Sequence, residues 1–408
     1  MEIRKIESSI KQIDKIYHVS DIHIRTLKRH KEYKTVFKNL FEYINTNATE
    51  NSVAVVTGDI VHSKLDMSPE LIQMLIEFFK GFTIPTIVIL GNHDMNLNNL
   101  YRLDAISPIL DGFVDSNIIF IKDNEVFEYG GITWNHMAVD VAPNEYVRGT
   151  DIDAPYKIAL HHGAVDTATT DIGYTISNKH VTTENFEGHN LVLLGDIHKP
   201  AQFLNDKKTI GYPGSLIQQN HGEALEHGIL VWDVKKKSSE FVKIENDYGY
   251  VTLITKGNKI IEHPKQMPKK PRIRIKFDNT DASDMKRLIA TIKKRYNVQD
   301  ISIQRSINNS INNVNANSVI GNIRDVEYQN TLLTDYVSTN FPQATEAEID
   351  AIRHINRNTN SKLPVLESVR HVTWKPLTFE FDNMFSYGQG NVVDFTCLES
   401  VWRSFLEI

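Results

Sequence analysis

Short apolar runs that stop abruptly at polar residues recur along the first half of this chain. The clearest is Ile87–Leu90, which is followed directly by Gly91-Asn92-His93-Asp94. The apolar half of such a stretch is typical of a buried strand. The polar half is typical of the end of a strand at the edge of a sheet, where α/β proteins have their binding and active sites. Four further strand-like runs end in the same way, at Asp21 and His23, at Gly58 and Asp59, at His161 and His162, and at Gly195, Asp196 and His198.

The spacing of apolar positions predicts alternating strands and helices through residues 1–245. Strands are expected at 15–20, 53–57 and 84–90, with helices between them from about 31 to 45 and from Ser68-Pro69 onward, where Ser68 is the cap. Beyond residue 118 strands dominate, at 118–121, 132–136, 157–161, 191–194, 228–232 and 240–244. We therefore expect an α/β fold with two packed mixed β-sheets flanked by helices.

The rest of the chain divides by composition. Gly, Pro and Lys accumulate at 246–270, and a strand at 271–277, a helix from about 283 to 296 and a strand at 300–304 follow. We expect residues 1–245 to form one domain and residues 246–305 a small α+β cap domain. Residues 306–322 are rich in Asn and Ser and predict a flexible linker. A helical segment at 323–370, with a capping box at Thr345 and Glu348, and a tail at 371–408 complete the expected order.

The composition indicates a globular protein without a membrane span, but it does not indicate a particular function. The chain has 408 residues, of which 41% are hydrophobic and 24% charged, as in ordinary globular proteins. No window approaches the roughly 18 uninterrupted apolar residues of a membrane span, and the first residues lack the apolar core of a signal peptide. The single cysteine, Cys397, excludes an internal disulfide and a cysteine-based zinc site. We expect an intracellular protein without a membrane partner. The net charge of −6 neither indicates nor excludes a polyanion.

The residues at the strand ends are of the types that bind divalent cations through oxygen and nitrogen. Asp21 and His23 point to the same side of an extended chain and can reach one ion together, and the two oxygens of Asp59 can bridge two ions. Two ions about 3.5–4 Å apart would provide a nucleophile at neutral pH and neutralise charge on a phosphodiester. His93 is placed to donate a proton or a hydrogen bond to the leaving oxygen.

Each motif also has an ordinary structural explanation when it is taken alone. An Asp-x-His at a strand end is usually a turn or a surface pair, and Gly-Asp after a strand is often only a turn. The ordered set of all five strand ends is what favours a metal centre. Five other histidines are expected to be structural, namely His18, His136, His180, His189 and His227.

The ordered set of motifs resembles the calcineurin-like metallophosphoesterase superfamily. Finer features look like the SbcD-type DNA repair exonuclease subunit, because His62 follows Asp59 by three residues and because Tyr212-Pro213-Gly214-Ser215 is followed by Gly222-Glu223. The resemblance covers residues 15–233 with specific motifs and implies a metallophosphoesterase sandwich.

The resemblance also implies roles for individual residues. It places Asp21, His23, Asp59 and His198 around one ion and Asp59, Asn92, His161 and Asp196 around the other, with manganese as the metal and magnesium as the alternative. His93, His62 and Asp94 are expected to be catalytic, with His93 assisting the transition state and His62 orienting the DNA end or the site. The family usually has histidine where Asp196 stands, which puts metal preference in doubt. Either His161 or His162 could be the ligand, and we favour His161.

The same family suggests partners for the remaining segments. Its cap domain touches DNA, and the strand face formed by Arg272, Arg274 and Lys276 fits such a role, although an edge strand protected by charge is an equal alternative. The helices after the linker lie where the family docks an SMC-like (SbcC-type) ATPase, although a helical hairpin packed on the core is as good an explanation. A homodimer acting at the nucleoid or at a viral replication site is also expected.

The tail resembles the opening strand of that ATPase family, from Thr378 to Gly388. A phosphate loop should follow in such a protein, and none occurs in this sequence. We therefore expect a fused or interrupted nuclease–ATPase reading frame, and a chain that does not hydrolyse ATP alone.

Three functions remain open. The first is a two-metal DNA nuclease, working as 3′→5′ exonuclease and single-strand endonuclease in repair or recombination. The second keeps the metals but acts on other phosphoesters, as a protein phosphatase or cyclic-nucleotide phosphodiesterase. The third is a non-catalytic assembly subunit whose site is degraded at Asp196, against which the retained His93 argues.

Overall fold

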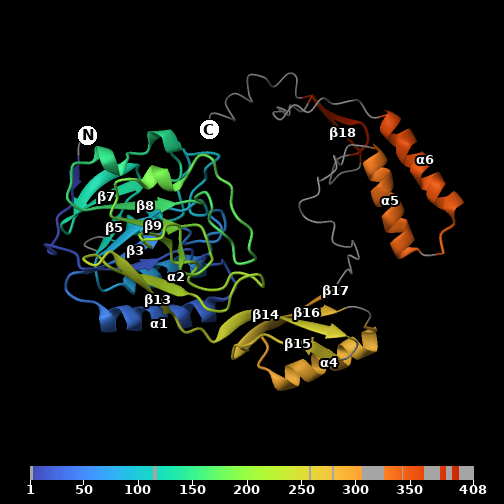
Figure 1. Ribbon diagram of the computed structural model, residues 1–408, viewed down its shortest axis with the longest axis horizontal. Helices are drawn as coiled ribbons and strands as arrows, with labels where there is room; N and C mark the ends of the chain where they lie inside the picture. Colours follow the sequence, from blue (N-terminus) through green and yellow to red (C-terminus); the bar gives the residue numbers. More distant parts are fainter. Residues whose placement is uncertain are drawn as a thin grey trace. The chain divides into compact units, whose positions relative to one another are not determined.

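The computed structural model describes residues 3–113, 117–256, 259–277, 280–305, 326–341, 343–362, 377–382 and 388–394. Contacts within the chain divide it into two compact units, Met1–Ser306 and Ile307–Ile408 (Figure 1). The expected linker at 306–322 lies outside the described residues.

A six-stranded sheet in the first unit holds three of the predicted strand ends. Its order is β13-β12-β2-β3-β4-β5. Strands β2 to β5 run parallel, and β12 is antiparallel to both of its neighbours, β2 and β13. All residues of β3 are buried, as in a strand covered on both faces. The strands span Lys15–Val19 (β2), Ser52–Thr57 (β3), Thr86–Ile89 (β4), Ile118–Phe120 (β5), Gly228–Asp233 (β12) and Ser238–Lys243 (β13).

A seven-stranded sheet holds the other two strand ends. Its order is β1-β6-β7-β8-β9-β11-β10, and β7, β8, β9 and β11 run parallel. The strands span Arg4–Lys5 (β1), Glu125–Tyr129 (β6), Ile132–Met137 (β7), Lys157–His162 (β8), Leu191–Gly195 (β9), Gln202–Phe203 (β10) and Ile210–Tyr212 (β11). Short helices lie in the connections, at Ser107–Leu110 (α3), Pro143–Glu145 (η1), Gly149–Asp151 (η2) and Thr183–Phe186 (η3).

The two sheets pack face to face, and helices cover the six-stranded one. Val55 and Ile89 of one sheet share a buried cluster with Trp134 and Leu160 of the other. The helices α1 (His30–Asn47) and α2 (Pro69–Lys80) bury their apolar stripes against the opposite face of the six-stranded sheet. Ser68 caps α2 as predicted, since its hydroxyl accepts the N–H of Leu71. The expected α/β fold with two packed mixed sheets and outer helices is confirmed.

A four-stranded sheet of order β15-β14-β16-β17 completes the first unit, and we call it the cap sheet. Ile273 and Ile275 face α4, where they meet Leu288 and Ile292, so the other face of this sheet carries the alternate residues of β16. The sequence pattern missed β14 because its glycine and threonines obscure the apolar alternation. The elements span Tyr248–Lys256 (β14), Lys259–Glu262 (β15), Lys270–Phe277 (β16), Ala282–Arg295 (α4) and Asp300–Arg305 (β17).

The second unit contains a pair of helices and a strand hairpin. The helices α5 (Val326–Asn340) and α6 (Glu346–Lys362) pack on each other, and β18 (Thr378–Phe381) pairs with β19 (Asn391–Asp394) in antiparallel fashion. The predicted capping box is present, since Glu348 accepts the backbone N–H and the hydroxyl of Thr345 at 2.7 and 2.9 Å. Within the described residues, none of the helices has the length and apolar character needed to span a membrane.

Candidate metal centre

The two sheets bring the polar strand ends to one place. Asp21 follows β2, and its carboxylate accepts the backbone N–H of Asp196, which follows β9 of the other sheet, at 3.1 and 3.2 Å. Side chains that are distant in sequence therefore converge at the carboxyl ends of parallel strands. The residues that meet here are Asp21, His23, Asp59, His62, Asn92, His93, His162, Asp196 and His198.

One group of candidate ligands consists of Asp21, His23 and His198. His23 Nε2 lies 3.0 Å from His198 Nε2. Asp21 Oδ1 lies 3.9 Å from the first of these nitrogens and 3.8 Å from the second. Three ligand atoms from two segments, the one after β2 and the one after β9, thus lie close together, which is the arrangement that a single divalent ion needs.

A second group consists of Asp59 and His162 together with Asp21, which also belongs to the first group. His162 Nε2 lies 3.3 Å from Asp59 Oδ1, 2.9 Å from Asn92 Oδ1 and 3.9 Å from Asp196 Oδ1. The other oxygen of Asp59, Oδ2, lies 3.5 Å from His23 Nε2 in the first group. Asp59 therefore presents one oxygen to each group, as a bridging ligand would.

The hydrogen-bond chemistry of the second group fits a cation. His162 Nδ1 lies 2.7 Å from the carbonyl oxygen of Thr57 and donates to it, which leaves neutral His162 with only a lone pair on Nε2. In that neutral form the lone pair would face the carboxylate oxygen of Asp59 and the amide oxygen of Asn92, and these three acceptors would repel one another unless Nε2 carried a proton or a cation lay between them. A positive ion between them would remove this repulsion and satisfy all three.

The protonation of the histidines indicates excess negative charge. Burial alone would lower the pKa of His162, but the charge and hydrogen bond of Asp59, with the charges of two further aspartates, raise it well above its ordinary value. Burial likewise opposes the rise at His198, yet the hydrogen bond to Glu223 and the charge of Asp21 raise its pKa to about 9. Carboxylates that draw protons onto buried imidazoles would equally draw divalent cations.

The structure corrects the choice between the two adjacent histidines, because His162, and not His161, faces the candidate ligands. Neighbouring residues of a strand point to opposite faces of the sheet, and β8 contains both. His161 Nδ1 donates to the carbonyl oxygen of Met137 at 2.8 Å, and its ring lies 5.5 Å from that of Tyr146 and 5.9 Å from that of Phe186. His161 therefore belongs to the packing on the other face of the sheet.

Asp94, expected among the catalytic residues, has a structural position instead. Its side chain is fully buried. One carboxylate oxygen accepts the N–H groups of Ile60 and Val61, and the other accepts the N–H of Gly91, all at 2.9 Å. These three bonds tie the loop after β3 to the loop after β4. Asp94 thus positions neighbouring ligands and has no oxygen left for a substrate.

His93 and His62 lie beside the first group. His93 Nδ1 donates to the carbonyl oxygen of His62 at 2.8 Å, and the His93 ring meets the His23 ring edge-on with centroids 4.9 Å apart. The His62 ring stacks on that of His93 at 5.8 Å. Its Nε2 accepts an N–H of Arg25 at 3.1 Å, and burial together with the charge of Arg25 lowers the pKa of His62. Arg25 therefore keeps His62 neutral.

Four of the candidate ligands have a left-handed backbone. The φ angles of Asp21, His23, Asp59 and Asp196 are 51°, 49°, 53° and 98°. Such angles cost residues other than glycine on the order of 1–3 kcal/mol each, and strain of this kind gathers at functional sites.

Three residues that support the site were not predicted as site residues from the sequence. Ser20 and Arg25 were not singled out at all, and Glu223 was quoted only as part of the Gly222-Glu223 motif. The Ser20 hydroxyl donates to Asp21 Oδ2, and Glu223 Oε1 accepts from His198 Nδ1 at 2.9 Å. Arg25 donates to Nε2 of His62. The contacts of all three residues depend on how the chain folds, so no local pattern in the sequence indicates them.

The basic face of β16 only partly matches its expected DNA-binding role. Arg272 Nη2 pairs with buried Glu32 at 2.7 Å, and only 11% of its side chain is exposed, so Arg272 forms an ion pair between α1 and the cap sheet and is not a freely exposed cation. Arg274 and Lys276 are half-buried on the face opposite α4. They remain available to an anionic partner.

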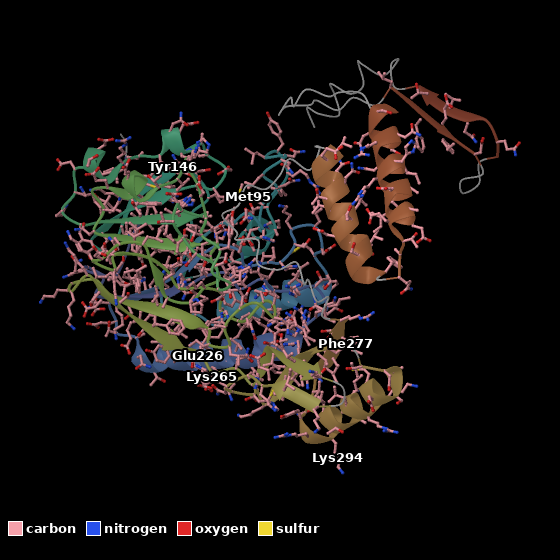
Figure 2. All side chains as sticks on the ribbon, turned by 45° about the vertical axis from the view of Figure 1, so that its right-hand side comes forward. Met95, Tyr146, Glu226, Lys265, Phe277 and Lys294 are labelled. Carbon is pink, nitrogen blue, oxygen red and sulfur yellow. The ribbon has the colours of Figure 1, made fainter. Side chains whose placement is uncertain are left out.

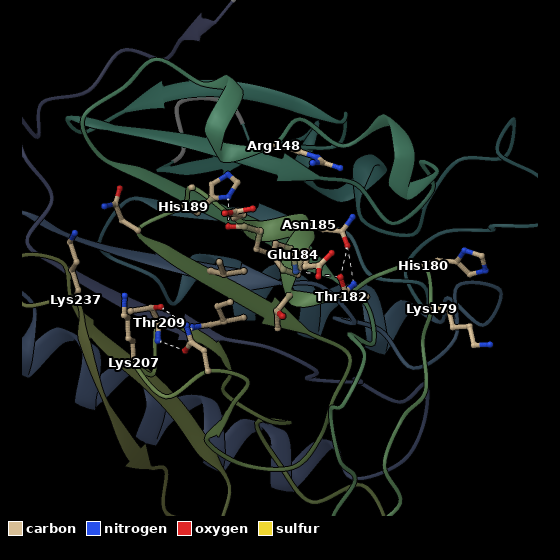
Figure 3. A pocket seen from close by; sticks show the side chains of 18 residues that line it. Arg148, Lys179, His180, Thr182, Glu184, Asn185, His189, Lys207, Thr209 and Lys237 are labelled. Carbon is tan, nitrogen blue, oxygen red and sulfur yellow. Dashed lines mark hydrogen bonds between the residues drawn. The ribbon is translucent and has the colours of Figure 1, made fainter.

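A cavity of about 990 Å³ lies elsewhere on the first unit (Figure 3). Its lining includes His180, His189 and several lysines around η3, and it includes none of the candidate metal ligands. Its size therefore says nothing about the metal centre.

Comparison with known proteins agrees with this geometry. Residues 14–200 match the model of the calcineurin-like phosphoesterase family. The chain is 37% identical over 412 residues to the uncharacterized protein R555 of Acanthamoeba polyphaga mimivirus, a match that covers 95% of this chain and 30% of that protein. It is 25% identical over 203 residues to a probable cyclic nucleotide phosphodiesterase of Xenorhabdus bovienii (strain SS-2004), covering 45% of this chain and 77% of that protein.

The chain therefore spans less than a third of the mimivirus relative. The family match and the clusters of histidine and aspartate that can hold metal support metal-dependent phosphoester hydrolysis. Every candidate ligand falls inside the matched region, and residues 14–200 accordingly form a calcineurin-like phosphoesterase domain.

Proposed function

We propose that this chain is a DNA nuclease that depends on two divalent ions, manganese or magnesium, and acts as a 3′→5′ exonuclease and single-strand endonuclease in repair or recombination. The observation that carries the proposal is the position of Asp59, whose two oxygens face His23 and His162 in two adjacent ligand groups. Two neighbouring cations are what hydrolysis of a phosphodiester requires.

The ligand set follows from the geometry. Asp21, His23 and His198 would hold one ion, and Asn92, His162 and Asp196 would hold the other, with Asp59 shared. When bound, the ions would supply a nucleophile at neutral pH and neutralise charge on the phosphoryl group. Asp196 adds a negative charge where the family usually has histidine.

His93 would act on the substrate directly. Its Nδ1 is committed to the carbonyl oxygen of His62, so Nε2 is the atom that can take up a proton and donate it. Donation to a phosphoryl oxygen, or to the 3′ oxygen as it leaves, would stabilise the departing charge. His62, held neutral by Arg25, would orient the end of the strand.

Two features favour a polynucleotide over a small phosphoester. Arg25 reaches the metal centre through His62, and the open face of the cap sheet presents Arg274 and Lys276. These side chains place positive charge outside the two ligand groups, where an extended polyanion could contact it and a small phosphoester at the metal centre could not.

A phosphodiesterase that acts on cyclic nucleotides is the second candidate. It is favoured by the similarity of 45% of the chain to a protein described as a probable cyclic nucleotide phosphodiesterase. The same metal centre would serve that reaction, so substrate tests must decide between the two.

The test incubates the purified chain with manganese and with 3′-labelled or 5′-labelled linear DNA, and in parallel with cyclic nucleotides. Release of mononucleotides that is lost in His93→Ala, while the variant still binds metal, is expected. Hydrolysis of cyclic nucleotides with DNA left intact would replace the proposal with the second candidate.

Two protein partners are also proposed. In a homodimer, the second copy would cover the apolar segment that follows the loop containing Asn92. Leu100, Tyr101 and Leu103 of this segment are 54%, 90% and 78% exposed. Light scattering after gel filtration would test whether the chain is a dimer.

An SMC-like ATPase would dock on the α5–α6 pair, where Tyr336 and Ile355 are exposed. Loss of co-purification with such an ATPase in Tyr336→Asp would support this docking.

A further inference from the structure

A cavity of about 690 Å³ lies where residues 25–32, at the start of α1, meet the cap sheet. We call it the core–cap pocket. Its acidic lining residues are Glu32 and Asp300, whereas its basic lining residues are Arg25, Lys28, Arg29, His30, Lys31 and Arg272. The pocket is therefore cationic although the whole chain carries a net charge of −6.

Glu32 cannot neutralise the two arginines that it contacts. Its oxygens lie 2.8 and 3.0 Å from nitrogens of Arg29 and 2.7 Å from Arg272 Nη2. Burial would raise the pKa of Glu32, but the hydrogen bonds and charge of Arg29, with the charge of Arg272, lower it, so the carboxylate stays ionised. One negative charge shared between two guanidinium groups leaves an excess of one positive charge.

Three buried N–H groups around this pocket have no hydrogen-bond partner within the part of the chain that the structure describes. They are Arg25 Nε, Arg29 Nη1 and Arg272 Nη1. The Arg29 side chain is only 4% exposed. Buried donors are rarely left unsatisfied, and guanidinium groups are the donors whose fork geometry matches phosphate oxygens.

An aromatic ring fixes the direction of these guanidinium groups. The Tyr250 ring lies 5.2 Å from the Arg29 guanidinium carbon and 5.1 Å from that of Arg272, and it meets the ring of His221 edge-on at 4.9 Å. Stacked arginines lose little further freedom when they bind an anion.

The pocket is continuous with the metal centre through one side chain. Arg25 lines the pocket and also donates to His62 Nε2 at 3.1 Å, and His62 stacks on His93. A strand cut at the metal centre could therefore pass Arg25 and place a phosphate several positions away in the pocket.

We propose that the core–cap pocket binds a phosphodiester group of the polynucleotide strand, away from the bond that is cut. The inference rests on the proposed nuclease function and deepens it, because a second phosphate contact distinguishes a chain from a single nucleotide. Affinity would then grow with strand length until the strand reaches the pocket.

The test uses the full chain, without metal and in EDTA, so that binding is measured apart from cleavage. Lys28→Gln/Lys31→Gln removes two exposed charges at the pocket. A matched control, Lys293→Gln/Lys294→Gln, removes two exposed charges from α4, where Lys294 projects away from the strands (Figure 2). Fluorescence anisotropy with a labelled single-stranded oligonucleotide is recorded at several salt concentrations.

The pocket variant should bind at least about tenfold more weakly at low salt. The slope of log affinity against log salt should also become shallower by about 0.7, for the one phosphate contact that is lost. The control variant should match the unaltered protein. Arg25→Gln should weaken binding as well, and thermal unfolding checks that each variant is folded.

Equal affinities and slopes for the pocket and control variants would overturn the inference, even if the chain cuts DNA. Inorganic phosphate that displaces the oligonucleotide at micromolar concentration would also overturn it, since the pocket would then take a free anion. A pocket that binds the oligonucleotide in a protein that never cuts DNA with manganese would instead contradict the nuclease function.

Discussion

Asp59 lies between two groups of ligands, and its surroundings hold it there. The N–H of His93 donates to its Oδ1 at 2.9 Å, and its backbone is left-handed with a φ of 53°. Burial would raise its pKa, but the charge and hydrogen bond of His162 and the charge of His23 lower it. Asp59 therefore remains an anion near neutral pH, as a shared metal ligand must.

Replacing Asp59 should remove both ions at once. Asp59→Asn keeps an oxygen for the N–H of His93 but loses the charge that both groups share. We expect metal analysis after dialysis against manganese to show neither ion retained, whereas Asp196→Asn should lose at most one. Retention of one ion by Asp59→Asn would contradict the bridging role.

The two adjacent histidines of β8 give a matched pair for the second ligand group. His162→Gln removes the nitrogen that faces Asp59 and Asn92, so we expect manganese affinity to fall by at least about tenfold. His161→Gln changes a ring on the other face of the sheet and should leave that affinity unchanged. Isothermal titration calorimetry measures both, and the reverse order would reinstate His161 as the ligand.

At the scale of elements, Glu32 joins helix α1 of the core to strand β16 of the cap sheet. Its carboxylate is completely buried and contacts Arg29, Arg272 and the side chain of Asn246. The basic side of β16, which the alternation predicted, therefore serves in part to attach the cap sheet to helix α1. A strand face can be read from sequence, but the partner that covers it cannot.

Removing the Glu32 charge should destabilise this junction. Glu32→Gln leaves two arginines close together without their counter-charge, and we expect the free energy of unfolding in urea to fall by about 3–5 kcal/mol. Glu77→Gln, in a surface pair with Lys34, is the control and should change it by less than about 1 kcal/mol. A similar small effect for both variants would show that the buried network adds little.

At the scale of the whole first unit, metal binding depends on the packing of two sheets, because each sheet supplies ligands to both groups. The same packing buries titratable groups that play no part in the site. His136 on β7 is one, since it is 2% exposed and its Nδ1 donates to the carbonyl oxygen of Asp123. Burial lowers its pKa from 6.5 to about 4.

This shift predicts how stability depends on pH. Below about pH 6.5 the unfolded chain takes up a proton at His136 that the folded protein accepts only near pH 4, so acid favours unfolding across this range. His136→Asn keeps the donor and does not titrate. Urea unfolding should show a smaller loss of stability between pH 7 and 4.5, by about 2.5 kcal/mol. Parallel profiles for the two proteins would contradict the prediction.

The local pattern of the sequence was enough to predict the five strands that end at the metal centre, the outer helices, the two caps at Ser68 and Thr345, and the five polar strand ends. Each of these depends on residues close together in the chain, where periodicity and capping act. The pattern missed β6, the short edge strands β10 and β15, and also β14. The same pattern predicted seven of the residues that meet at the metal centre, because parallel strands present their carboxyl ends at one edge.

Only the tertiary structure decided which side chains face one another. His162 and His161 have the same side chain and differ in the face of β8 on which they lie. Asp94 belongs to the Gly91-Asn92-His93-Asp94 motif, but both of its carboxylate oxygens accept hydrogen bonds from backbone N–H groups, three in all. Arg272 alternates with apolar residues like a free surface cation, yet it forms a buried ion pair with Glu32 of another element. Contacts between distant segments settle such roles, and the order of residues along the chain does not encode them locally.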